Sequence, residues 1–214
     1  MRYHRIPDET VRRMPFYLRG VRILSEQGRS SICSKSLADC LGISDWQIRK
    51  DFSYFGDFGK PGVGYDSAKL EKRISKILNL GCGHKVALVG VGNLGSAILA
   101  FNGFGQYGFN IVAAFDCDAK KISKKRGPVI IEDVSKIAKL KKRRVDIGII
   151  AVPASMAQEV ADALVAVGVK GLLNFAPVRI NVPKKIKVIT IDIAIELARL
   201  PYYMASSQSQ SAWE

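Results

Sequence analysis

The sequence predicts an α/β protein in which a small helical domain precedes a domain built on a parallel β-sheet. Up to about residue 82, apolar residues recur at helical spacing between polar stretches. Beyond it, short β-branched runs alternate with helical stretches, as in parallel sheets whose strands are joined by helices. Two glycines interrupt the pattern at 79–85 (NLGCGHK) and favour a boundary there. We therefore expect a domain at 1–82, a second at 83–191, and a C-terminal helix with a polar tail at 192–214.

The composition indicates a soluble protein and leaves its partner open. No apolar run approaches the roughly 20 residues of a membrane-spanning helix, and the N-terminus lacks the apolar segment of a secretory signal. The net charge of +14 favours a polyanionic partner, but both halves share it, and it is equally typical of a protein that is merely soluble. We expect free thiols, a cytoplasmic location and no metal, because neither a C-x-x-C motif nor zinc spacing links Cys33, Cys40, Cys82 and Cys117.

The first predicted element of the N-terminal domain is a long helix at 10–27. Thr10 can cap its start, and Gly28 can end it. Part of its apolar face consists of Leu18, Val21, Ile23 and Leu24.

Two shorter helices follow. The first is predicted at 34–41 and ends at Gly42, and Ser44 then caps a second helix that begins at Asp45. Two short helices joined by a glycine-containing turn form a helix-turn-helix, whose second helix enters the major groove of DNA.

The second of these helices offers polar side chains that could read DNA. Gln can bond adenine through two atoms, and Arg or Lys can bond guanine, whereas phosphate contacts position the protein without reading sequence. The candidates for DNA contact are Ser44, Gln47, Arg49, Lys50 and Tyr54. We expect core or hinge positions for Trp46, Ile48, Phe52 and Phe55.

The segment at 56–66, GDFGKPGVGYD, alternates aromatic or apolar residues with glycines, which is typical of a tight β-hairpin. A hairpin directly after a reading helix is a wing, and Lys60 near its tip would reach phosphate or the minor groove. The alternative is a helical interaction domain whose basic residues are only solvated. The hairpin and the positive charge together favour a winged helix-turn-helix that binds DNA.

The second domain opens with an apolar strand, the G-x-G-x-x-G motif of Gly90, Gly92 and Gly95, and a helix, as in a Rossmann dinucleotide-binding fold. Gly90 permits the turn, Gly92 lets the backbone approach a pyrophosphate, and Gly95 lets helix and strand pack closely. N–H groups at the helix start would bind the phosphates. The candidates in this loop are Gly90, Val91, Gly92, Asn93, Leu94 and Gly95, and the strands are expected at 85–90, 110–115, 128–131, 145–152, 170–175 and 187–191.

Asp116 ends the second strand, about 21 residues after Gly95, where an acid accepts hydrogen bonds from the adenosine ribose. Such an acid repels a 2′-phosphate, so we expect NAD(H) rather than NADP(H). The basic run KKISKKR at 120–126 points slightly the other way, and we expect it to be a solvated helix face. Cys117 beside the acid is a further candidate contact, as a reactive thiol or as an inert small residue.

Two further strand ends are expected beside the nicotinamide. Ligands of open α/β sheets bind outside the carboxyl ends of the strands. Strand 145–152 leads to Pro153, and strand 170–175 leads into Asn174, Phe175, Ala176 and Pro177. An ordinary turn residue is the alternative for Asn174.

A dehydrogenase is the main alternative function, because Rossmann domains commonly serve hydride transfer. That chemistry needs a substrate site and commonly a proton-transfer residue. The two histidines, His4 and His84, lie away from the predicted strand C-terminal ends, and only one helix and a tail are predicted after the sheet. We therefore predict no catalytic residues and a cofactor that acts as a signal.

With both domains in place, the sequence resembles the Rex family of redox-sensing transcriptional repressors over about residues 7–205. The resemblance implies a homodimeric repressor that NADH releases from operator DNA, whereas NAD⁺ permits binding. It also implies that a C-terminal helix is exchanged between the subunits. The matching segments are QIRKDFSYFGDFGKPGVGYD (47–66), GVGNLGSA (90–97), FDCD (115–118), NFAP (174–177) and IDIAIELARL (191–200).

The exchanged helix corresponds to about 192–205 in this sequence. Ile193, Leu197 and Leu200 stand at helical spacing, which fits insertion into an apolar groove, although the helix could equally cover its own subunit. Pro201 predicts a kink or an early end.

The family also implies roles for single residues. Arg49, Lys50 and Lys60 would contact DNA, Gly90 to Gly95 would hold the pyrophosphate, and Asp116 would hold the ribose.

Arg19 and Asp192 stand where the family links domain posture to redox state. Two positions depart from the family pattern. Pro61 replaces a basic wing residue of many members, and Phe101 replaces a Tyr found in several. A Tyr hydroxyl could bond to an acid such as Asp192, whereas Phe101 cannot.

Overall fold

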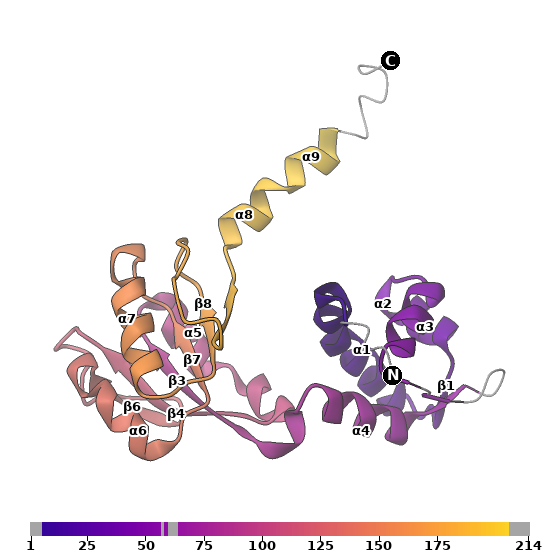
Figure 1. Ribbon diagram of the computed structural model, residues 1–214, viewed down its shortest axis with the longest axis horizontal. Helices are drawn as coiled ribbons and strands as arrows, with labels where there is room; N and C mark the ends of the chain where they lie inside the picture. Colours follow the sequence, from indigo (N-terminus) through magenta and orange to yellow (C-terminus); the bar gives the residue numbers. More distant parts are fainter. Residues whose placement is uncertain (1–5, 57, 60–63, 206–214) are drawn as a thin grey trace. The chain divides into compact units, whose positions relative to one another are not determined.

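The computed structural model describes residues 6–56, 58–59 and 64–205, and its chain divides into two compact units, Met1–Cys82 and Gly83–Glu214 (Figure 1). The first unit is mainly helical, and the second holds a seven-stranded sheet. His4, Lys60 and Pro61 lie outside the described residues. In the part of the chain that is described, no helix has both the length and the apolarity to cross a membrane.

Helix α1, Asp8–Glu26, is the longest element of the first unit. Gly28, predicted to end it, follows the C-cap residue with a φ of 83°. The predicted cap is wrong: Pro7 occupies the N-cap position, and Thr10 lies buried inside the helix with its hydroxyl donating to Asp51. A long-range bond therefore takes the hydroxyl that local pattern assigns to the helix start.

The two short helices match the prediction. Helix α2 spans Ser34–Leu41 and ends at Gly42, which adopts a left-handed conformation with φ 65°. Helix α3 spans Asp45–Ser53, and the Ser44 side chain caps it by accepting from the backbone N–H of Gln47.

A two-stranded antiparallel sheet flanks this motif. Strand β1, Ser31–Ile32, pairs with β2, Tyr65–Asp66, and α4 (Ser67–Ile77) and the 3-10 helix η1 (Leu80–Cys82) follow. Residues 57 and 60–63 of the hairpin predicted at 56–66 lie outside the described residues, so the hairpin stays a prediction. Among the described residues, β2 pairs with β1, which precedes α2 and buries Ile32.

The core of the first unit is shared by all its α-helices. Ile48 and Phe52 are buried as predicted, and Phe55 is half-buried. Trp46 is 57% exposed, so of the two positions predicted for it, core or hinge, the core position is wrong. Because successive residues turn by about 100°, Trp46 stands about 200° around α3 from Ile48. The large buried side chains are Met14, Tyr17, Leu18, Val21, Leu24, Ile32, Leu37, Ile48, Phe52, Leu70 and Ile74.

The second unit has the strand order β5-β6-β4-β3-β7-β8-β9, and all strands are parallel except β5, which is antiparallel to β6. Every predicted strand is present. Their bounds are β3 His84–Val89, β4 Phe109–Asp116, β6 Val129–Asp133, β7 Ile147–Ile150, β8 Gly171–Asn174 and β9 Lys187–Thr190.

The basic run at 120–126 is not the helix face that the sequence suggests. It forms turns and strand β5, Lys125–Arg126, which pairs with β6. Gly127, with φ 53°, and Pro128 reverse the chain between these strands, and a left-handed residue followed by proline does not continue a helix.

Helices cover both faces of the sheet. On β3, Val86 and Leu88 join the core beneath α5, Asn93–Ala100, while Ala87 and Val89 join the core beneath α7, Ala154–Ala166. This alternation buries both faces of the strand. The remaining helices are η2 Asn102–Tyr107, η3 Val134–Lys139 and α6 Leu140–Arg143.

The C-terminal segment forms two short helices, α8 Ile193–Ala198 and α9 Leu200–Ala205. Pro201 stands at the start of α9, which agrees with the predicted break. The large apolar side chains of both helices are exposed in the single chain, namely Ile193, Ile195, Leu197, Leu200, Tyr202, Tyr203 and Met204.

Candidate functional site

Helix α3 of the helix-turn-helix has one buried and one exposed face. Ile48, Asp51 and Phe52 are buried. The exposed residues recur at i, i+3, i+4 and i+7 and therefore share one face. They are Trp46, Arg49, Lys50 and Ser53.

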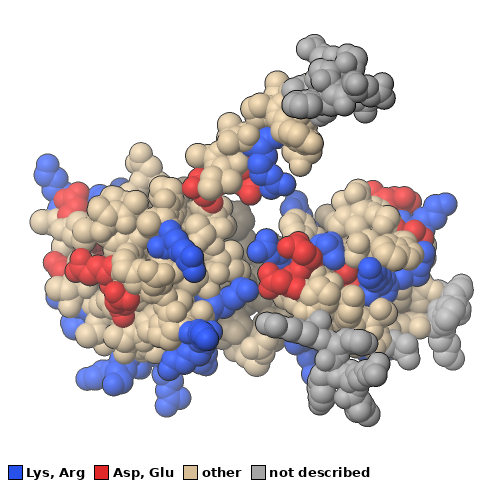
Figure 2. All heavy atoms as spheres, turned by 45° about the horizontal axis from the view of Figure 1, so that its top comes forward, with Lys and Arg blue, Asp and Glu red and all other residues tan. Residues whose placement is uncertain are grey.

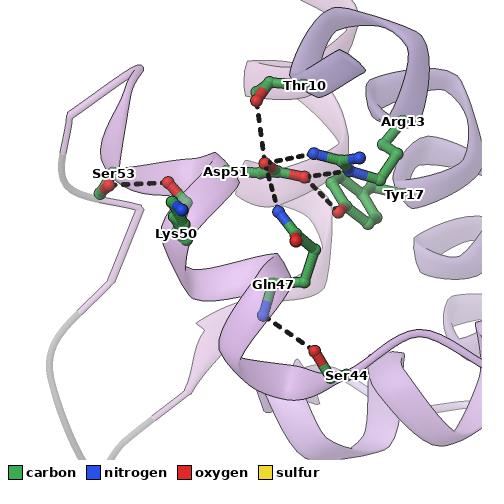
Figure 3. Close-up of polar contacts among 8 residues, drawn as sticks. All are labelled: Thr10, Arg13, Tyr17, Ser44, Gln47, Lys50, Asp51 and Ser53. Atoms are coloured by element: carbon green, nitrogen blue, oxygen red, sulfur yellow. Dashed lines mark hydrogen bonds and ion pairs between the residues drawn. The ribbon is translucent and has the colours of Figure 1, made fainter. Parts of the chain in front are cut away.

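The buried face is anchored by the carboxylate of Asp51, which is 0% exposed (Figure 3). It accepts hydrogen bonds from Arg13 Nε at 2.6 Å and Arg13 Nη2 at 2.9 Å, and from the Tyr17 hydroxyl at 2.5 Å. The Thr10 hydroxyl and the Gln47 side-chain amide each donate to it at 2.9 Å. Asp51 therefore links α3 to α1 and fixes which face of α3 points outward.

Burial raises the pKa of Asp51, but the hydrogen bonds from Arg13, Tyr17 and Thr10 outweigh it and hold the pKa below its ordinary value. The same cluster raises the pKa of Tyr17, chiefly through burial. Asp51 was not among the predicted site residues. An acid at 51, on the helix face shared by Ile48 and Phe52, is the sequence signal that could have identified it.

The predicted DNA contacts are distributed unevenly over α3. Arg49 and Lys50 are exposed, although Arg49 pairs with Asp45 of the preceding turn. Gln47 is half-buried, and its amide nitrogen faces Asp51, which can only accept. Ser44 is exposed at the cap, and Tyr54 is half-buried at the helix end.

Charge alone does not mark a DNA-binding surface. Lys and Arg side chains cover parts of both units in the space-filling view (Figure 2). The placement of Arg49 and Lys50 on the exposed face of α3, the second helix of the helix-turn-helix, is the more specific observation.

The Gly-rich loop in the second unit has the packing that the motif requires. Gly90 has a φ of 93°, and a side chain there would meet the carbonyl of Ala151. A side chain at Gly95 would meet the carbonyl of Gly90, and one at Gly92 would meet nothing within 4 Å. Two glycines are thus needed for packing, and the third leaves open space at the start of α5.

Asp116 lies at the end of β4, 7% exposed, and supports this loop. It accepts from the backbone N–H groups of Val91 and Asp118, each at 2.8 Å, and from Lys121 Nζ at 3.1 Å. Burial raises the pKa of Asp116, but these donors outweigh it and keep the pKa below its ordinary value. Sequence reasoning missed Lys121 as its partner, because the run at 120–126 was expected to point into solvent.

Two hollows flank the loop. One, of about 350 Å³, is lined by Gly90, Gly92, Asp116, Cys117 and Pro153, among others. The other, of about 280 Å³, is lined by Gly92, Asn93, Ser96, Lys121, Lys124 and Arg126, among others. The fold therefore brings together the predicted loop, Asp116, Cys117 and Pro153.

The residues after β8 do not line either hollow. Asn174 is fully buried, and its amide bonds the carbonyls of Ala176 and Val178 and the N–H of Ala176. Phe175 is half-buried, Ala176 is buried, and Pro177 borders a separate hollow near Asp192. In the single chain, Asn174 shapes its own turn.

The three residues expected to couple the domains lie in different settings. Arg19 is exposed on α1, and Phe101 is exposed after α5, with its ring 5.0 Å from that of Phe104. Asp192 caps α8 by accepting from the N–H groups of Ala194 and Ile195 at 3.0 and 3.2 Å.

Two family models match the chain. A CoA binding domain matches residues 83–178, and a putative DNA-binding protein N-terminus matches residues 5–53. The redox-sensing transcriptional repressor Rex of Chloroflexus aurantiacus is 43% identical over 203 residues, 94% of this chain and 96% of the relative. That of Streptomyces coelicolor is 39% identical over 208 residues, 97% of this chain and 81% of the relative.

Solved structures of a repressor also match the chain over most of its length. RSP in complex with β-NAD⁺ and operator DNA matches with a TM-score of 0.89 and 31% identity, covering 95% of this chain and 94% of RSP. RSP in complex with β-NADH matches with a TM-score of 0.86 and 29% identity, covering 95% and 96%. RSP is itself described as a Rex-family repressor. Likeness of this extent in both sequence and fold shows that the chain belongs to the Rex family of redox-sensing transcriptional repressors.

Proposed function

We propose that this chain is a DNA-binding transcriptional repressor that responds to the NADH/NAD⁺ ratio and leaves its operator when NADH binds. The observation that carries this function is the full-length match to RSP, which has been solved with operator DNA and NAD⁺ and, separately, with NADH. The chain is thus a regulator and not a dehydrogenase, and NAD(H) is its signal.

On the DNA side, α3 of each subunit enters the major groove, and Arg49 and Lys50 contact the operator. Their exposure on one face of the helix supports this role. Ser44, Gln47 and Tyr54 make further contacts at the edges of that face, where Gln47 keeps its carbonyl oxygen free of Asp51. Lys60 adds a wing contact from a position outside the described residues.

On the cofactor side, the residues present fit a dinucleotide. The open space at Gly92 admits a pyrophosphate to the loop of Gly90–Gly95, where the first N–H groups of α5 bind it. Asp116 accepts hydrogen bonds from the adenosine ribose hydroxyls. It does so through carboxylate lone pairs that the N–H groups of Val91 and Asp118 do not use, or after Lys121 moves away. NAD(H) supplies its redox state, and the protein supplies the binding.

The nicotinamide end lies toward the strand-end loops of β7 and β8. Cys117 and Pro153 border the larger hollow beside the Gly-rich loop, which supports their role as cofactor neighbours. Asn174, Phe175, Ala176 and Pro177 form the neighbouring loop. Asn174 holds that loop in shape through its buried amide, so it acts through the loop rather than by reaching the ring.

The functional protein is a homodimer in which the C-terminal helices are exchanged. The exposed apolar side chains of α8 and α9 support this assembly, because they lose contact with water only against another surface. Arg19 and Asp192 couple domain posture to the cofactor. Phe101 contributes ring contacts in place of a hydroxyl bond.

Fluorescence anisotropy tests the function directly. A palindromic duplex selected from random DNA is titrated at fixed salt, with NAD⁺ or NADH present. We expect NADH to weaken operator binding about 5- to 150-fold, and DNA to weaken NADH binding by the same factor. DNA binding with the same affinity in NAD⁺ and in NADH would overturn the proposal. An absence of specific DNA binding would favour the alternative of an enzyme that turns over NADH.

A further inference from the structure

The exposed face of α3 begins with a tryptophan. Trp46 is the second residue of the helix, directly after Asp45, and 57% of it is exposed. A large apolar ring left in water at this position contributes little to the core of the unit.

The ring of Trp46 contacts a lysine on the exposed face of α3. Lys50, one helical turn further on, places its Nζ 4.7 Å from the centre of the Trp46 ring. A cation over an indole ring is attracted to its face, so the two side chains restrain each other. The pair presents an apolar surface and a positive charge side by side.

This outward orientation of Trp46 follows from the buried face of the helix. Asp51 is tied to Arg13 and Tyr17 of α1, and the amide of Gln47 is turned toward it (Figure 3). These bonds fix the rotation of α3 about its axis. Trp46 therefore stays outside, while Gln47 at the next position is half-buried.

We propose that Trp46 is a specificity-determining residue that packs against the C5 methyl group of a thymine in the operator, while Lys50 donates to a neighbouring base edge or phosphate. The proposal rests on the proposed function and goes beyond it by naming what is read. N-terminal residues of a reading helix lie nearest the base edges. In the major groove only thymine presents a methyl group, and apolar side chains recognise it.

Replacing thymine by deoxyuridine tests this contact, because the substitution removes only the methyl group. Each thymine of the selected operator is changed in turn, and anisotropy is measured with the full-length wild-type chain. We expect one symmetry-related position at which deoxyuridine weakens binding about fourfold, as for one buried methyl group. The variant Trp46→Ala binds more weakly and no longer distinguishes thymine from deoxyuridine there.

Phe16→Ala is the matched control. Phe16 is an exposed aromatic residue of the same unit, 56% exposed, but it lies on α1. This variant keeps the deoxyuridine penalty. Thermal unfolding of Trp46→Ala checks that the fold is retained, as expected for an exposed side chain.

A second measurement follows Trp46 itself. The chain has two tryptophans, Trp46 and Trp213, so Trp213→Phe leaves Trp46 as the only reporter. We expect the emission of Trp46 to change when operator DNA is added. When NADH is present and keeps the protein off the operator, the same addition of DNA should leave the emission unchanged.

The inference would be overturned if no deoxyuridine substitution weakened operator binding, or if Trp46→Ala showed the same loss of affinity with deoxyuridine as the wild-type chain. Either outcome would leave the repressor function intact. A wild-type chain that selects no operator would overturn the function itself.

Discussion

The two units each contain a buried, ionised aspartate, and the two carboxylates are held in different ways. Asp51 is held by side chains of α1 that stand 34 to 41 residues away, together with Gln47 of its own helix. Asp116 is held mainly by backbone N–H groups, and its one side-chain partner, Lys121, is about a third exposed. Asp51 is enclosed by the protein, whereas Asp116 stands at a strand end and lines the larger of the two hollows beside the Gly-rich loop.

This difference separates two uses of a buried charge. A carboxylate whose acceptor sites are filled by side chains of a neighbouring helix orients an element, which here is α3. A carboxylate held by backbone N–H groups and by a part-exposed lysine, as Asp116 is, keeps its place at the edge of a hollow. Variants at the two aspartates should therefore separate the DNA-binding function from the NADH-binding function.

The largest effect is expected from Asp51→Ala. Removing this carboxylate leaves the buried hydroxyls of Thr10 and Tyr17 without their acceptor, and each unsatisfied buried group costs about 1–3 kcal/mol. We expect the first unit to unfold or to lose operator binding, while NADH affinity of the second unit stays unchanged. Denaturant unfolding and NADH titration measure the two effects.

Asp39→Ala is the control for that experiment, because Asp39 is an exposed acid on the neighbouring helix α2. It should change the free energy of unfolding by no more than about 0.5 kcal/mol. An Asp51 variant as stable as this control would contradict the orienting role of Asp51.

Asp116→Ala should act on the other function. Losing an ionised acceptor for the ribose costs about 1.5–3 kcal/mol, or about 10- to 150-fold in NADH affinity. Operator binding without cofactor should be spared, and its response to NADH should disappear. Calorimetric NADH titration and anisotropy measure these outcomes.

Asp133→Ala provides the comparison, since Asp133 ends the adjacent strand β6 opposite Asp116 and caps η3. Its variant should bind NADH as the parent does. Equal NADH affinity in the Asp116 variant and the parent would remove Asp116 from the cofactor site.

The same contrast explains what could be predicted from sequence. The hydrophobic period and the turn and cap residues predicted α2, α3 and every main strand. These signals, such as Gly42, Ser44 and the β-branched runs, determine structure within a few residues of themselves. The partners of Asp51 and Asp116 were missed for different reasons. Arg13 is remote in sequence from Asp51, and Lys121 was assigned to a helix, whereas its segment turns at Ser123, with φ 67°, and continues into β5.

Trp46 was predicted to be more buried than it is. Its size and apolar character suggested a core position, and only the rotation of α3, set by bonds to α1, places it outside. Residue type predicts burial on average, but the orientation of a short helix depends on contacts that local pattern does not contain.

Lys50→Ala should produce a smaller effect, confined to DNA. Loss of one contact costs about 1 kcal/mol, roughly fivefold in operator affinity, and a phosphate contact would also reduce the salt slope by about 1. NADH affinity should match that of the parent. A Lys50→Ala variant that loses both functions would indicate misfolding and would contradict a role of Lys50 confined to DNA.

The smallest effect is the dependence of the first unit on acid. A carboxyl group whose folded pKa is depressed contributes its stability fully above its unfolded pKa, about 3.9, and loses it as pH falls through the folded value. Because the pKa of Asp51 is lowered, we expect the free energy of unfolding of the first unit to fall as pH drops below about 4.

Trp46 emission in the Trp213→Phe chain reports on this unit, and Asp51→Asn provides the comparison. The Asn variant should start from a lower stability and show a flatter pH dependence, because its side chain does not titrate. Parallel pH curves for the two proteins would place the acid sensitivity in another carboxyl group. Asp51 would then orient α3 through its geometry alone.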